Sequence, residues 1–164
     1  MNTAMNLSDA LDPGTQMFWR HVGTAFLCGA AIGLERQFRG KVAGMRTSIL
    51  ITLGTAYFVT LGASMVPGGT DPTRVLGQVV TGIGFLGAGV ILARGDRIIG
   101  VTTAAVIWVL AAIGALIGAG YLPAAMVATL MTLLVLVGVE GLERRLLRRT
   151  SGRGSGVYGT IDPE

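Results

Sequence analysis

The sequence predicts an all-α, polytopic membrane protein with five transmembrane helices. Of its 164 residues, 51% are hydrophobic and only 13% are charged, whereas a soluble domain carries about 25% charged residues. The 26 glycines lie largely inside apolar stretches, where small residues let membrane helices pack closely. Five such stretches approach the roughly 20 apolar residues that a bilayer requires. They cover residues 17–34, 47–66, 75–93, 98–118 and 121–139.

The first of these stretches is the least apolar. Arg20 and His21 shorten its apolar part, so it spans a bilayer only if both side chains extend to the interface. Trp19 beside them is suited to anchor the helix at that interface.

The basic residues predict the orientation. Eleven of them fall after the first, third and fifth stretches, and only Arg20 and Arg74 fall on the other side. Because cytoplasmic loops are enriched in Lys and Arg, we expect the N-terminus outside and the C-terminus in the cytoplasm. Five crossings require the same arrangement.

Three regions follow from this topology. Residues 1–16 are expected to be a disordered extracytoplasmic N-terminus, and residues 17–140 form the membrane domain. Residues 141–164 begin as a basic helix end and continue into Gly, Ser and Pro residues, which predicts a partly disordered cytoplasmic tail.

Glycine-rich motifs in the apolar stretches favour helix packing over nucleotide binding. Gly82, Gly84 and Gly87 fit a G-x-G-x-x-G pattern, but a dinucleotide site would need a preceding strand and an acidic residue about 20 positions on. We therefore predict that these glycines pack helices or subunits. The full predicted packing set is Gly29, Gly33, Gly82, Gly84, Gly87 and Gly89.

Hydroxyl side chains offer a second candidate feature. Thr102 and Thr103 stand near the start of the fourth stretch, where they either cap a helix or line a polar region facing the cytoplasmic loops. Hydroxyls in the second stretch, such as that of Thr52, more often bond to backbone carbonyls one turn back than line a pathway. Together with Gln78, these three threonines form the possible polar pathway.

The most informative segment joins the first two stretches, at residues 33–47 (GLERQFRGKVAGMRT). It concentrates charge beside apolar sequence, and Gly40 and Gly44 permit a turn. Glu35 is expected to pair with Arg39 at i, i+4. Arg46 opposes the dipole of the next helix and calls for an acid such as Glu35 or a bound anion. The predicted functional cytoplasmic patch is Glu35, Arg36, Arg39, Arg46 and Thr47.

Catalytic or metal-binding patterns are not apparent. Cys28 is the single cysteine, and no Ser/His/Asp, Cys/His or metal-ligand spacing occurs. The sequence therefore indicates a protein that is not an enzyme and has no cofactor or metal site. The basic residues lie beside apolar segments rather than along one soluble face, which argues against nucleic-acid binding.

Three motifs resemble the MgtC/SapB family of bacterial inner-membrane proteins. They are GLERQFRGKVAGMRT, GQVVTGIGFLGAGVIL and RIIGVTTAAVIWVLAAIGALIGAG, in that order, over roughly residues 22–120. The resemblance implies a multi-pass protein linked to growth at low magnesium and, in pathogens, to virulence through survival inside macrophages. Many members carry a soluble cytoplasmic domain after the fifth helix, so this sequence resembles a short form without it.

The resemblance further implies a non-enzymatic regulator that acts on membrane partners, including the proton-driven ATP synthase. Two other functions stay open from the residues. One is a small ion transporter, for magnesium or coupled to protons, and the other is a scaffold that binds anionic lipid at Arg36, Arg39 and Arg46. The glycine motifs predict a homo-oligomer within membrane lipids.

Overall fold

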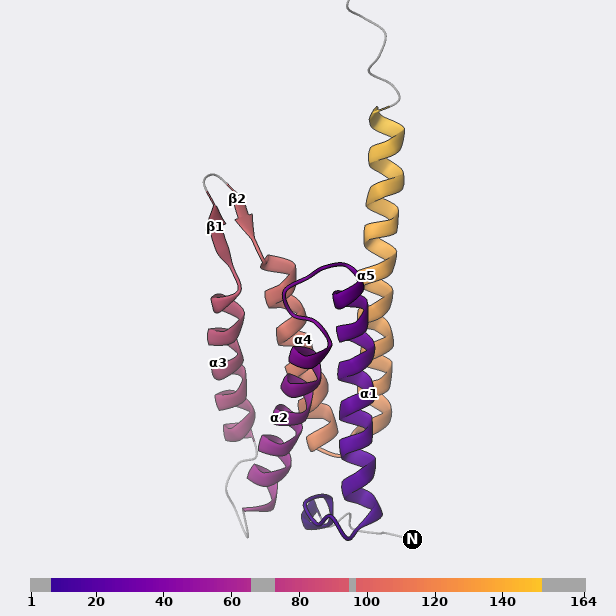
Figure 1. Cartoon of the computed structure of the whole chain (residues 1–164). Helices are drawn as coiled ribbons and strands as arrows, with labels where there is room; N and C mark the ends of the chain where they lie inside the picture. Colours follow the sequence, from indigo (N-terminus) through magenta and orange to yellow (C-terminus); the bar gives the residue numbers. More distant parts are fainter. Residues whose placement is uncertain (1–6, 66–72, 95–96, 152–164) are drawn as a thin grey trace, which may run out of the picture.

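The computed structural model describes residues 7–65, 73–94 and 97–151, which form a bundle of five α-helices (Figure 1). Successive helices run in alternating directions, so the α1–α2 connection and the distal part of α5 lie at the same end of the bundle. The helices are α1 (Gln16–Phe38), α2 (Met45–Ser64), α3 (Thr73–Gly89), α4 (Val101–Gly118) and α5 (Leu122–Ser151).

The all-α prediction is confirmed with one exception, a small hairpin between α3 and α4. Strand β1 (Leu92–Arg94) pairs antiparallel with β2 (Arg97–Ile99), and Leu92 faces Ile99 in the register. The third helix was predicted to end at residue 93 but ends at Gly89, and the fourth was predicted to begin at residue 98 but begins at Val101. The hairpin occupies the difference. The left-handed Gly100 (φ 95°) ends the strand and starts α4, a conformation that glycine adopts without steric cost.

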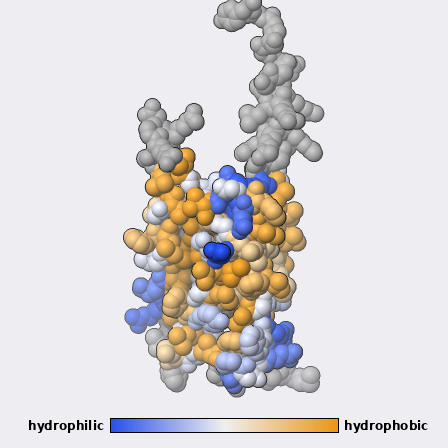
Figure 2. All heavy atoms as spheres, viewed as in Figure 1, coloured by the Kyte–Doolittle hydropathy of each residue, from blue (hydrophilic) through white to orange (hydrophobic). Residues whose placement is uncertain are grey.

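Three helices are long and apolar enough to cross a membrane among the described residues. They are α2, α4 and the first part of α5, Leu122–Val139. Helix α1 carries Arg20 and His21 near its start, and α3 has only 17 residues. On the face shown in Figure 2, hydrophobic residues cover most of the length of the bundle, and hydrophilic residues gather in a few separate patches. The protein is therefore a membrane protein with at least these three candidate spans.

Close backbone contacts join α1 to α2 and α2 to α4. A Cβ on Gly33 would lie 2.5 Å from Cα of Met45, and one on Gly29 would lie 2.8 Å from Cα of Ile49. Helix α4 approaches α2 in the same way, since a Cβ on Gly114 would lie 2.5 Å from the Thr52 carbonyl oxygen. Side chains at these positions would separate the helices. Gly29 and Gly33, which were predicted to pack helices, thus lie directly against α2 within the same chain.

Both ends of the described chain are more regular than expected. Residues Leu7–Ala10 form a short 3-10 helix, and Ala10 is buried. Thr15 caps α1 through its hydroxyl, which accepts from the Phe18 N–H at 3.3 Å. Helix α5 continues to Ser151, into the segment predicted to be a partly disordered tail. The disorder predicted for residues 1–6 and 152–164 lies outside the described residues.

Candidate functional site

The centre of the candidate site is a buried arginine near the end of α1. Arg36 is 2% exposed, and its Nη2 donates a hydrogen bond to Oγ1 of Thr103 at 2.6 Å. Thr103 lies in the first turn of α4 and is itself buried. A charged side chain is rarely buried in this way without a specific reason. The contact joins two segments that are separated by 67 positions in the sequence.

The turn after α1 explains how Arg36 is fixed. Gly40 adopts a left-handed conformation (φ 63°), its N–H bonds to the Gln37 carbonyl, and the Lys41 N–H bonds to the Arg36 carbonyl, both at 3.0 Å. These two bonds form the Schellman motif that commonly ends a helix at glycine. The motif folds the basic loop back over the last turn of α1, as the sequence predicted for Gly40.

A cavity of about 610 Å³ opens at this end of the bundle, and we call it the Arg36 cavity. It lies among the end of α1, the following loop, the hairpin, the start of α4 and one face of α5. Its polar lining comes from Glu35, Arg36, Arg39, Lys41, Thr102 and Thr103. Its apolar lining includes Val90, Leu92, Ile98, Ile99, Val101, Val135, Leu136 and Val139.

Glu35 and Arg39 form the ion pair expected from their spacing. Nε of Arg39 lies 2.5 Å from Oε1 of Glu35, and both side chains are largely buried. Neither Glu35 carboxylate oxygen has a hydrogen bond of good geometry within the described residues. The pair neutralises the acidic group of the lining, so Glu35 is not left to compensate Arg46.

Arg46 and Thr47 lie away from this cavity. Both are exposed at the start of α2, where solvent screens the unfavourable position of Arg46 near the helix dipole. The Met45 N–H is instead capped by Oε1 of Gln37 from α1, at 3.4 Å. Three of the five predicted patch residues, Glu35, Arg36 and Arg39, therefore share one cavity.

Backbone donors from α4 complete the site. Gly100 is the N-cap without a side-chain bond, and the first helical bond runs from the Ala104 N–H to the Gly100 carbonyl at 2.9 Å. The N–H groups of Val101, Thr102 and Thr103 precede that bond and have no acceptor inside the helix. All three residues line the Arg36 cavity, so Thr102 and Thr103 correspond to the polar lining rather than to helix caps.

The four residues of the possible polar pathway do not converge. Thr102 and Thr103 line the Arg36 cavity, whereas Gln78 is exposed on α3. The Thr52 hydroxyl donates to the Ser48 carbonyl at 2.9 Å, one turn back in α2, which is the backbone bonding that membrane helices favour.

The glycines of α3 differ from those of α1. A Cβ on Gly82, Gly84 or Gly89 would meet nothing within 4 Å, and one on Gly87 would make only ordinary contact with Ala104. Within one chain these positions do not bring helices together as Gly29 and Gly33 do. Their role in packing between subunits stays a prediction.

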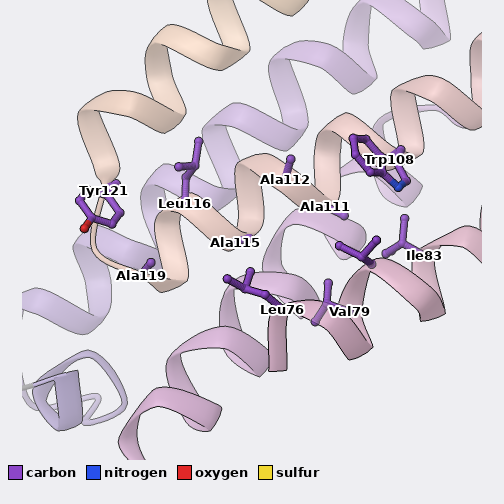
Figure 3. A pocket seen from close by; sticks show the side chains of 11 residues that line it. Leu76, Val79, Ile83, Trp108, Ala111, Ala112, Ala115, Leu116, Ala119 and Tyr121 are labelled. Atoms are coloured by element: carbon purple, nitrogen blue, oxygen red, sulfur yellow. The ribbon is translucent and has the colours of Figure 1, made fainter. Parts of the chain in front are cut away.

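A second cavity of about 440 Å³ separates α3 from α4 (Figure 3). Its lining is almost wholly apolar, with Ile83 and Trp108 near one end and Tyr121 near the other. Such a surface offers hydrocarbon contact but no charged group. Of these two cavities, the Arg36 cavity is the one with a charged lining.

Two structural features could not be predicted from the sequence. Lys41 is one of the basic residues of the segment 33–47, and nothing in its spacing indicates that it shares a cavity with Thr103. Gly114 and Gly118 form a small-xxx-small pattern, which is typical of close helix packing but does not identify the partner helix, α2. Among the described residues, no group of three or more His, Cys, Asp or Glu side chains is placed to hold a metal ion.

Comparison with known proteins identifies relatives over most of the chain. The model of the MgtC family matches residues 22–145. "Putative magnesium transporter YhiD" of Escherichia coli K12 is 47% identical over 137 residues, covering 79% of this chain and 63% of that protein. "Protein MgtC" of Brucella abortus strain 2308 is 50% identical over 124 residues, covering 76% of this chain and 50% of that protein.

"Protein MgtC" of Salmonella typhimurium LT2 is 46% identical over 109 residues, covering 66% of this chain and 46% of that protein. The chain thus spans between about half and two thirds of the length of these relatives. No solved structure matches it significantly. The matched region contains most of α1, all of α2, α3 and α4, most of α5 and all residues of the Arg36 cavity. The chain therefore belongs to the MgtC family.

Proposed function

We propose that this protein is a non-enzymatic membrane regulator in magnesium homeostasis and membrane energetics, and that it acts through the Arg36 cavity. The observation that carries the proposal is the buried hydrogen bond between Arg36 and Thr103. A buried charge costs desolvation energy, so its position in an open cavity at the loop end of the bundle is better explained by function than by stability.

The proposed setting is the inner membrane, with five crossings and the Arg36 cavity on the cytoplasmic side. The alternating helix directions in Figure 1 support five crossings, because the start of α1 and the end of α5 lie at opposite ends. The bias of basic residues supports the orientation. In this arrangement the cavity faces the cytoplasm beside the inner leaflet.

The proposed partners are a membrane protein, such as the ATP synthase or a transporter, together with membrane lipid and further copies of this chain. The loop around Gly40 supports a protein contact, since Phe38 and Val42 there are 83% and 87% exposed. Large exposed apolar side chains beside a charged cavity are typical of interaction sites.

Transport is the second candidate function, and a relative's name favours it, since YhiD is called a "putative magnesium transporter". On this alternative, α2 to α4 would line the path and Thr52, Gln78, Thr102 and Thr103 would contribute. The separate positions of Gln78 and Thr52 give this alternative less support than the single cavity gives regulation.

Two measurements together test the proposal. Growth in limiting magnesium should require the wild-type chain and should be impaired by Arg36→Gln but not by Arg46→Gln, which removes the same charge from an exposed position. Purified protein in liposomes should show no saturable magnesium or proton flux. Saturable flux that Arg36→Gln abolishes would support transport instead, and equal growth of all variants would remove the cavity from the function.

A further inference from the structure

Arg36 has a buried donor that nothing in the described chain satisfies. Its Nη2 bonds to Thr103, but its Nε has no hydrogen-bond partner although the residue is 2% exposed and lines the cavity. A guanidinium presents its N–H donors along fixed edges that match the oxygens of phosphate and carboxylate. Leaving a buried donor unpaired is unfavourable, so an acceptor is expected at this position.

The start of α4 supplies further donors to the same space. This helix has 18 residues, and the N–H groups of its first turn carry a partial positive charge that favours anions. Val101, Thr102 and Thr103 line the Arg36 cavity. Residues that carry two independent sets of donors, one on α1 and one on α4, therefore border one cavity.

The charge of the lining selects the sign of the ligand. Arg36, Arg39 and Lys41 face the cavity with Glu35 as the acidic residue of the described lining, and Glu35 is paired with Arg39. A magnesium ion would be repelled by this excess of positive charge, whereas an anion would be attracted.

We propose that the Arg36 cavity binds the phosphate group of an anionic ligand. The ligand would accept from the Arg36 guanidinium, whose Nε is covered in this structure and would turn toward the cavity on binding, and from the first N–H groups of α4, with Lys41 adding a charge at the rim. The inference rests on the proposed function, because it assigns a ligand to the cavity through which the regulator acts. Arg46, which the sequence placed in the same patch, has no part in the site.

The cavity suits two sources of phosphate. A volume of about 610 Å³ admits a phosphate ester with a polar substituent. The apolar side chains of Val135 and Val139 from α5, together with Ile98 from the hairpin, are exposed beside the polar floor. This arrangement fits a phospholipid headgroup with its chains against α5, and it also admits a soluble phosphate ester.

Binding to the purified full chain tests the proposal and separates the sources. In neutral detergent, native mass spectrometry would compare retention of phosphatidylglycerol and phosphatidylcholine, and calorimetry would titrate inorganic phosphate and glycerol 3-phosphate. We expect phosphate-bearing anions to bind and Arg36→Gln to weaken binding about tenfold or more. The matched variant Arg46→Gln should bind as the wild type does.

Retention of phosphatidylglycerol alone identifies a headgroup as the source, and binding of the soluble probes identifies a free phosphate ester. Equal weakening by Arg36→Gln and Arg46→Gln would overturn the proposal, because it would mean general surface attraction. Failure of all the probes to bind the wild type would overturn it as well.

Glu35→Gln gives a test of opposite sign. It removes the acidic group of the lining, so a phosphate site should bind more tightly and a cation site should lose its ligand. If Arg36→Gln does not fold, the ¹⁵N signal of the Arg36 Nε in the wild-type chain should still shift on addition of the bound probe; an unchanged signal contradicts the site. These binding results are independent of growth, so a growth defect of Arg36→Gln without phosphate binding would sink this inference and leave the proposed function standing.

Discussion

Nη2 of Arg36 lies 2.6 Å from Oγ1 of Thr103, and this contact ties the end of α1 to the first turn of α4. Both side chains are buried, so the bond is shielded from competition by water. Hydrogen bonds to charged groups contribute about 1.5–3 kcal/mol to stability. The contact should therefore be measurable as a coupling between two helices that are distant in the sequence.

Replacing Thr103 by Val tests that coupling. The variant keeps the shape of the side chain but removes the acceptor, so Arg36 loses its partner and the unfolding free energy should fall by about 1–3 kcal/mol. Thr102→Val, at the exposed neighbouring position, should change it by less than about 0.5 kcal/mol. Chemical unfolding in mild detergent measures both. Similar stability of the two variants would mean that the Arg36 bond contributes nothing.

Arg36→Gln and Arg46→Gln each remove one positive charge, so the two variants can be compared directly. Arg36→Gln removes a buried guanidinium with its packed stem and should destabilise the protein by about 2 kcal/mol or more. Arg46→Gln acts at an exposed site and should stay within about 0.5 kcal/mol of the wild type. Thermal unfolding followed by circular dichroism checks the order. A larger loss of stability for Arg46→Gln would instead indicate that an acidic group or a bound anion pairs with Arg46.

The contact between α2 and α4 should tolerate no added methyl group. A Cβ on Gly114 would lie 2.5 Å from the Thr52 carbonyl oxygen, so Gly114→Ala should push the helices apart and cost about 1–3 kcal/mol. In Gly54→Ala the same methyl group enters open space in α2, and the variant should gain up to about 1 kcal/mol from the better helix propensity. Opposite signs in the unfolding free energy are the expected result. Two changes of the same sign would contradict the close approach of α4.

Gly84→Leu separates packing within a chain from packing between chains. Because a Cβ on Gly84 meets nothing within 4 Å, unfolding of the single chain should be nearly unchanged. If α3 forms the subunit interface of the expected homo-oligomer, the variant should lower the mass of the detergent-solubilised particle. Light scattering measures the mass of the detergent-solubilised particle. Gly77→Leu, at another open position of α3, serves as the comparison. An unchanged mass would remove Gly84 from any such interface.

The sequence predicted the helices well because apolar length is a local signal. Each of the five stretches corresponds to one helix, and Glu35 pairs with Arg39 as the i, i+4 spacing indicated. The hairpin was missed although Gly95 and Asp96 stand between the two strands, a pair typical of two-residue turns, because the surrounding apolar run resembled a helix. The sequence could not predict that Thr103 is the partner of Arg36, because a contact across 67 residues depends on how α1 and α4 pack.

Gly100 and Gly40 make the last prediction, because both have a positive φ but differ in their surroundings. Alanine in a left-handed conformation costs about 1–2 kcal/mol, and Gly40→Ala should lose about that amount, since its Cβ would meet nothing within 4 Å. At Gly100 a Cβ would also collide with the Val90 carbonyl oxygen, so Gly100→Ala should destabilise the protein clearly more. The collision would displace the start of α4, which lines the Arg36 cavity. Hydrogen exchange of the α4 amides should therefore accelerate in Gly100→Ala and not in Gly40→Ala; equal exchange would show that the turn at Gly100 does not hold α4 in place.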